Sequence, residues 1–93
     1  MSTTLGPETH VRVGGSVYAR PFGEDVVLLE FGRGEYFALD PIGADVWRAL
    51  ETGVSLGSIA EQIARAYDVS EAQALTDILA LVHAMHARAL VSY

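Results

Sequence analysis

The sequence predicts one α+β domain in which short strands precede three helices. Runs of β-prone apolar residues are confined to the first third of the chain, whereas the remainder has helical periodicity. The 93 residues are 51% hydrophobic, which is enough for one modest core, and they include no cysteine that could form a disulfide. Because the strands and helices are segregated along the chain, an α+β layout is favoured over an alternating α/β one.

A β-hairpin is the clearest of the strand predictions. Residues 25–31 form a dense β-prone run, and residues 26–29 are consecutive and apolar, as expected of a strand covered on both faces. Gly32-Arg33-Gly34 supplies a flexible reversal, and residues 35–39 resume as the second strand.

The N-terminal part of the chain has weaker strand signals. Residues 17–20 form a short β-prone run that Pro21 ends. Whether residues 10–13 add another short strand is left open. We expect an N-terminal segment at 1–16 and the folded domain at 17–93.

The first helix has a start signal and an amphipathic pattern. Asp40 is the predicted N-cap and Pro41 the first helical residue, while Gly53 ends the helix. One face of this helix is apolar and consists of Ile42, Val46, Trp47 and Leu50. We expect Trp47 to anchor the core.

Two further helices follow, each with an N-cap serine. The second opens near Ser55 or Ser58, and Glu61 gives Ser58 the spacing of a capping box. Its apolar stripe consists of Ile59, Ile63 and Tyr67. The third begins at Ser70, which has Gln73 at the same spacing, and runs to about residue 88. Residues 90–91 are expected to close the domain as a short strand or a tail.

The third helix carries apolar residues on two adjoining faces. The wider face, suited to burial against other helices, consists of Leu75, Ile78, Leu79, Val82 and Met85. The second face consists of Ala80, Leu81 and Ala84, with Asp77 at its start and Arg88 at its end. Small alanines could form the floor of a groove, and simple burial on two sides explains the pattern equally well.

Residues 35–39 are the last strand before the helices, which favours a position at a sheet edge. An edge strand presents unpaired N–H and C=O groups that an added peptide strand can use. The alternative is an edge that merely faces water.

Charge argues against polyanionic partners. Twelve acidic residues oppose six arginines, for a formal net charge of −6. A field of this sign repels phosphate backbones and anionic membrane surfaces. The N-terminus lacks the pattern of a secretory signal, and no apolar run approaches the roughly 18 residues of a membrane span. A soluble cytoplasmic protein is the expectation, with no nucleic acid and no membrane among its partners.

No motif for catalysis stands out. His83 and His86 lie on one side of the predicted third helix, but only carboxylates or the distant His10 could complete a metal site, so surface histidines are favoured. The serines lie in no nucleophile-elbow pattern, and no phosphate-binding loop sequence occurs. We expect no enzyme activity, no cofactor and no metal.

The ordered set of motifs resembles the PqqD-like recognition element of pathways that modify ribosomally made peptides. The resemblance rests on the apolar strand at 26–31, the Gly-Arg-Gly turn, the aromatic strand at 35–39 and the helix start at 40–44. It continues through Ala60, Ile63, Ala64, the Tyr67-Asp68-Val69-Ser70 connection, Asp77-Ile78 and Leu90, so that it covers roughly residues 17–91. The short chain and the Val17-Tyr18-Ala19-Arg20 lead-in are most similar to the separate recognition proteins of lasso-peptide clusters.

The resemblance implies a winged helix-turn-helix fold that binds the N-terminal leader of a precursor peptide. The leader would add antiparallel to one strand edge, formed by Gly34, Glu35, Tyr36, Phe37, Ala38 and Leu39. The opposite wall would consist of Asp77, Ala80, Leu81, Ala84 and Arg88, with Asp77 and Arg88 able to pair with polar leader groups. Tyr36 and Phe37 would have pocket or core roles, depending on the phase of the strand.

A lasso-peptide role further implies a guest with a Tyr-x-x-Pro segment, delivered to a leader peptidase and then to a cyclase. A monomer or weak dimer is expected. Asp40 and Met85 depart from the family's usual Asn and Leu, without consequence for the fold. Two alternatives stay open: a DNA-binding winged helix, for which the helices offer few basic residues, and an obligate subunit that buries its third helix against another chain.

Overall fold

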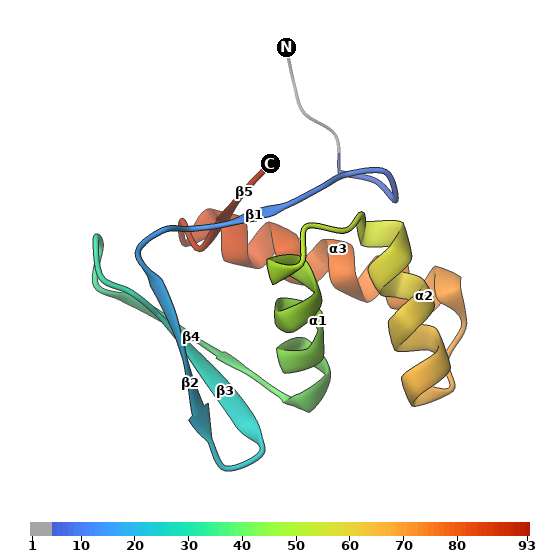
Figure 1. Ribbon diagram of the computed structural model, residues 1–93, viewed down its shortest axis with the longest axis horizontal. Helices are drawn as coiled ribbons and strands as arrows, with labels where there is room; N and C mark the ends of the chain where they lie inside the picture. The colour runs from blue at the N-terminus through green and yellow to red at the C-terminus, as the bar shows by residue number, and fades with distance from the viewer. Residues whose placement is uncertain (1–4) are drawn as a thin grey trace.

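A computed structural model describes residues 5–93, and residues 1–4 of the predicted N-terminal segment lie outside the described residues. The elements along the chain are β1 (Arg12–Val13), β2 (Val17–Phe22), β3 (Asp25–Glu30), β4 (Glu35–Leu39), α1 (Pro41–Glu51), α2 (Leu56–Tyr67), α3 (Glu71–Ala87) and β5 (Val91–Ser92). Figure 1 shows the three-stranded sheet beside the helices. The predicted α+β class, with a three-stranded antiparallel sheet before three helices, is confirmed.

The larger sheet is antiparallel with the strand order β2-β3-β4. Gly23 and Glu24 form a two-residue turn between β2 and β3, and Gly23 adopts a φ of +66° that hairpin turns of this length require. β2 continues through Pro21 to Phe22, beyond the end predicted at Arg20. A proline is tolerated there because β2 is an edge strand.

Side chains of β3 alternate between a buried and a half-buried face. Val26 and Leu28 are buried against the helices, whereas Val27 and Leu29 are only half-buried. The prediction that both faces of this strand are covered is therefore wrong, because the helices cover one face of the sheet. On the other face Tyr18 lies opposite Leu29, which lies opposite Tyr36.

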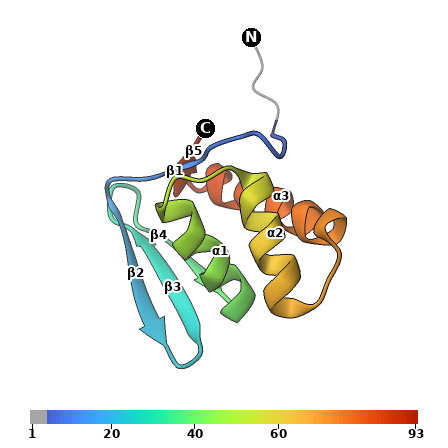
Figure 2. The ribbon, with the colours of Figure 1, turned by 45° about the vertical axis from the view of Figure 1, so that its right-hand side comes forward.

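The two ends of the described chain meet in a small second sheet. β1 pairs antiparallel with β5, and the amide of Gly14 donates to the carbonyl of Leu90 at 2.9 Å. Val11 and Leu90 beside these strands are buried. Figures 1 and 2 show both strands lying on the same side of the helices. The sequence analysis left a strand near residues 10–13 open, and the structure has one at Arg12–Val13.

Each helix has a polar N-cap at a position that the sequence analysis named. Asp40 accepts from the amide of Gly43 at 2.7 Å, and Ser70 accepts from that of Gln73 at 3.1 Å. The sequence left the start of α2 open between Ser55 and Ser58, and the structure has Ser55 as the N-cap, which accepts from the amide of Ser58 at 3.2 Å. The capping-box spacing of Ser58 and Glu61 is therefore not used to start the helix. At the end of α2, Asp68 adopts a left-handed conformation with a φ of 54°, which turns the chain toward α3.

The core lies between one face of the large sheet and the helices. α1 packs against the sheet and α2, while α3 packs against α2 (Figures 1 and 2). The largest fully buried side chains are Leu28, Val46, Leu50, Leu56, Ile59, Ile78, Val82, Met85 and Leu90. Trp47 is buried as predicted, whereas Ile42 is 42% exposed and does not belong to the core. No helix within residues 5–93 is both long enough and apolar enough to cross a membrane.

Candidate functional site

β4 has a free edge in the described chain, and the hydrogen-bond parity of the sheet shows which groups face it. The amide of Phe31 donates to Ser16 on the β2 side, so odd-numbered residues of β3 bond toward β2. Even-numbered residues of β3 therefore bond toward β4, whose partners are Glu35, Phe37 and Leu39. The N–H and C=O groups of Tyr36 and Ala38 consequently point away from β3.

The opposite edge of the sheet is formed by β2 and is less suited to pairing with an added strand. The same parity directs the backbone of Val17, Ala19 and Pro21 away from β3 along the outer edge of β2. Pro21 has no N–H to donate, which weakens this edge as a template for another strand. The edge of β4 contains no proline.

Side chains of β4 alternate between the helices and the outer face of the sheet. Leu39 is buried, Phe37 is half-buried against the core, and Tyr36 is 66% exposed. The sequence analysis left open whether Tyr36 or Phe37 would face the pocket or core. Phe37 faces the core, and Tyr36 lies on the opposite face of the sheet. Gly34 precedes β4 in the turn, where its φ of +70° favours glycine.

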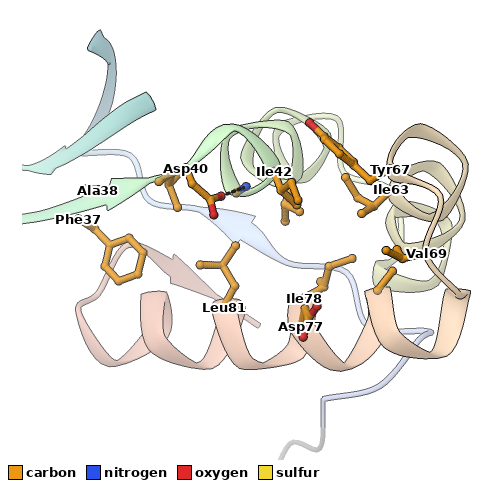
Figure 3. Close-up of a pocket in the computed structure, with 14 residues that line it drawn as sticks. Phe37, Ala38, Asp40, Ile42, Ile63, Tyr67, Val69, Asp77, Ile78 and Leu81 are labelled. Atoms are coloured by element: carbon orange, nitrogen blue, oxygen red, sulfur yellow. Dashed lines mark hydrogen bonds between the residues drawn. The ribbon is translucent and has the colours of Figure 1, made fainter. Parts of the chain in front are cut away.

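A cleft of about 500 Å³ lies between β4 and the helices. Figure 3 shows Phe37 extending from the strand toward α3 and Leu81 extending back from α3. The lining residues come from β4, all three helices and the α2–α3 connection: Phe37, Ala38, Leu39, Asp40, Ile42, Gly43, Val46, Ile63, Tyr67, Val69, Ala74, Asp77, Ile78 and Leu81. Most of these side chains are apolar, which is typical of sites that take an apolar ligand group.

Two carboxylates border the cleft. Asp40 is tied to the start of α1 through the amide of Gly43 at 2.7 Å. Asp77 accepts from the side-chain amide of Gln73 at 3.0 Å and is exposed. Asp40 is thus committed to its helix cap, whereas Asp77 keeps free acceptor capacity at the rim.

The end of the cleft beyond the strand is formed by Tyr67, Ile42 and Val69. The hydroxyl of Tyr67 donates to Asp45 on α1, which fixes the ring against the neighbouring helix. This hydrogen bond, followed by burial and the negative charge of Asp45, raises the pKa of Tyr67 above its usual value of 10.0. Ile42 and Val69 are 42% and 41% exposed, so apolar surface is open to a ligand there.

Arg88 lies just after α3, outside the lining of the cleft but in contact with β4. Its Nη1 donates to the carbonyl oxygen of Tyr36 at 3.1 Å and lies 3.9 Å from a carboxylate oxygen of Glu35. Its guanidinium carbon lies 5.4 Å from the centre of the Phe37 ring, within the range of a cation–π contact. Arg88 thus contacts three consecutive residues of β4.

The predicted site residues fall into two groups. Those that line the cleft are Phe37, Ala38, Leu39, Asp77 and Leu81. Those outside its lining are Gly34, Glu35, Tyr36, Ala80, Ala84 and Arg88. Glu35 and Tyr36 contact Arg88, Ala84 is half-buried, and Ala80 is exposed. The α3 wall is formed by Ala74, Ile78 and Leu81 rather than by the alanines at 80 and 84.

Sequence reasoning missed the end of the cleft at Ile42, Ile63, Tyr67 and Val69. It assigned the first three to helix cores and Val69 to a connection. The available signal was Val69, an apolar residue in the short connection between two predicted helices. Only the packing of α1, α2 and α3 brings these four positions together.

The histidines of α3 show no sign of a metal site. His83 and His86 are both exposed, and His86 packs on Tyr93 with ring centres 4.6 Å apart. Among residues 5–93 no three His, Asp or Glu side chains gather in a way that could hold a metal ion.

The described residues thus form a small α+β domain in which the open edge of β4 lies beside an apolar cleft. The chain belongs to the family described as coenzyme PQQ synthesis protein D (PqqD), whose model matches residues 25–91. The predicted resemblance to the PqqD-like recognition element is confirmed. A comparison with curated proteins found no match.

Two solved structures share the fold. One, described as "TbiB1 in Complex with the TbiA(beta) Leader Peptide", is 27% identical with a TM-score of 0.81 and covers 87% of this chain and 94% of its own. The other, described as "Lasso peptide synthetase B1 complexed with the leader peptide", is 25% identical with a TM-score of 0.82 and covers 91% of this chain and 100% of its own. Both similar proteins are complexes with leader peptides.

Proposed function

We propose that this chain is a non-catalytic recognition protein that binds the leader of a ribosomally synthesised precursor peptide in lasso-peptide biosynthesis. The observation that carries the proposal is the free edge of β4 beside the apolar cleft. A leader strand that pairs with Tyr36 and Ala38 gains backbone hydrogen bonds, and its side chains facing the helices enter the cleft. The similarity to two leader-peptide complexes supports the same function.

The guest chemistry follows from the lining of the cleft. Apolar walls formed by Phe37, Leu81 and Ile78 favour aromatic or aliphatic leader side chains. Asp77 at the rim favours a donor or a cationic group on the leader. We propose that the leader carries a Tyr-x-x-Pro segment and that the bound complex is presented to a leader peptidase and then to a cyclase. The protein acts in the cytoplasm as a monomer or weak dimer.

Direct binding of a labelled leader tests the proposal. Fluorescence polarisation with synthetic leader peptides of precursors encoded beside this gene should give a Kd in the micromolar range or tighter. A scrambled peptide of the same composition controls for nonspecific adsorption. Binding of both peptides with equal affinity, or of neither, contradicts leader recognition.

A pair of variants on α3 tests whether the cleft is the site. Leu81 is half-buried and lines the cleft, whereas Ala72 is exposed near the start of α3. Leu81→Glu should abolish leader binding by placing a charged carboxylate in the apolar cleft, and Ala72→Glu should leave it unchanged. Both substitutions alter the net charge equally, so equal losses would point to charge rather than to the cleft.

A further inference from the structure

The only edge-facing carbonyls within β4 are those of Tyr36 and Ala38, and one of them is already occupied. Nη1 of Arg88 donates to the carbonyl oxygen of Tyr36 at 3.1 Å. This distance is that of an ordinary backbone N–H···O bond. The guanidinium therefore lies where the N–H group of a strand added to β4 would have to lie, because paired strands are only about 4.8 Å apart.

The neighbours of Arg88 hold it in this position. Its backbone is fixed at the end of α3, where its amide donates to the carbonyl of Met85 at 3.1 Å. Glu35 lies 3.9 Å from Nη1, and the Phe37 ring lies beneath the guanidinium. The side chain of Arg88 nevertheless remains 48% exposed, so it can leave the edge for water without breaking the core.

We propose that Arg88 is a displaceable cap on the β4 edge, which a captured peptide must remove from the carbonyl of Tyr36. The inference rests on the proposed function. In it Arg88 competes with the guest for the carbonyl of Tyr36 instead of attracting the guest. In the free protein the cap satisfies an exposed acceptor and opposes pairing between the edges of two copies. A peptide that gains too little from the cleft cannot replace the contacts of Arg88, so the cap favours guests that fill the cleft.

The test compares Arg88→Met with Arg65→Met. Methionine keeps an apolar stem but has no donor for the carbonyl of Tyr36. Arg65 is exposed on α2 and pairs only loosely with Glu61 at 3.8 Å, so its substitution gives the same charge change away from the cleft. Thermal unfolding of both variants verifies that each is folded.

Leader affinity is measured by fluorescence polarisation with the labelled synthetic peptide. Release of one competing hydrogen bond should make Arg88→Met bind about two- to tenfold more tightly than the wild type. Arg65→Met should match the wild type. Equal or weaker binding by Arg88→Met overturns the cap, and weaker binding identifies Arg88 as a partner of the guest.

Self-association without peptide gives a second readout that does not depend on leader recognition. Multi-angle light scattering across a concentration series should show more dimer for Arg88→Met than for Arg65→Met at the same concentration. If the peptide binds none of the proteins, the proposed function fails and this measurement alone decides the cap. Indistinguishable association of the two variants then overturns it.

Discussion

Proline at position 38 should impair the free edge of β4 and leave the rest of the fold unchanged. The backbone of Ala38 points away from β3, because its neighbours Phe37 and Leu39 make the bonds to that strand. Ala38→Pro therefore removes a donor from the free edge and leaves the β3–β4 ladder intact. Phe37, which precedes the new proline, is already extended, so its restriction by proline is compatible with the strand.

The magnitude follows from the groups that the edge offers. Tyr36 and Ala38 together present two donors and two acceptors to a guest strand. Loss of the Ala38 donor costs about 0.5–1.5 kcal/mol as a net hydrogen bond, or about 1–3 kcal/mol when the guest carbonyl stays buried without a partner. The proline ring also keeps the guest from approaching closely, which favours the upper part of that range. We expect affinity for the leader to fall by roughly 10- to 100-fold.

Ala19→Pro is the matched control. Ala19 is exposed, and its backbone points away from β3 on the outer edge of β2. The substitution therefore removes an edge donor from the other side of the same sheet. Leader affinity of Ala19→Pro, measured by fluorescence polarisation, should equal that of the wild type. Strand addition at β4 is refuted if Ala38→Pro, shown to be folded by circular dichroism, binds within about twofold of this control.

Three further predictions concern side chains. Phe37→Ala should weaken leader binding about tenfold by removing an apolar wall of the cleft, whereas Tyr36→Ala on the outer face should not; equal effects in titrations would contradict the assigned strand phase. The raised pKa of Tyr67 means that its hydrogen bond stabilises the fold fully below pH 10.0 and is lost as pH rises through the higher folded-state pKa. The stability advantage of the wild type over Tyr67→Phe in urea unfolding should therefore vanish at strongly alkaline pH, and persistence there would disprove the linkage. Ser55→Ala should lower the free energy of unfolding by about 1 kcal/mol and Ser58→Ala by clearly less, the reverse order being evidence for a cap at Ser58.

Local signals allowed much of the fold to be predicted from the sequence. The glycine turn at 32–34 between two β-prone runs predicts the hairpin, and β4 has the predicted bounds Glu35–Leu39. Asp40 and Ser70 mark the starts of α1 and α3 because their side chains accept hydrogen bonds from amides three residues later. Ser55 and Ser58 are chemically equivalent as caps, so only the packing of α2 decides between them.

Contacts between distant residues were beyond sequence reasoning. The pairing of β1 with β5 joins segments from opposite ends of the chain, and two-residue strands carry too little pattern to predict it. The contact of Arg88 with Tyr36 spans 52 positions and depends on where α3 ends relative to β4. Ile42 has helical spacing with Val46, yet the orientation of α1 leaves it at the cleft rather than in the core.

The cleft is long enough to bind both anchors of the proposed Tyr-x-x-Pro leader segment, which are three residues apart. In an extended strand, residues at that spacing point to opposite faces, so a Tyr-x-x-Pro segment paired wholly with β4 could place only one anchor toward the helices. The cleft, however, continues past Leu39, where β4 ends, along α1 and α2 to Tyr67 and Val69. One anchor can therefore enter between Phe37 and Leu81 while the other lies beyond the ladder, where no strand geometry fixes its direction. Binding at both positions would also set the register, because a one-residue slip turns the paired anchor away from the helices.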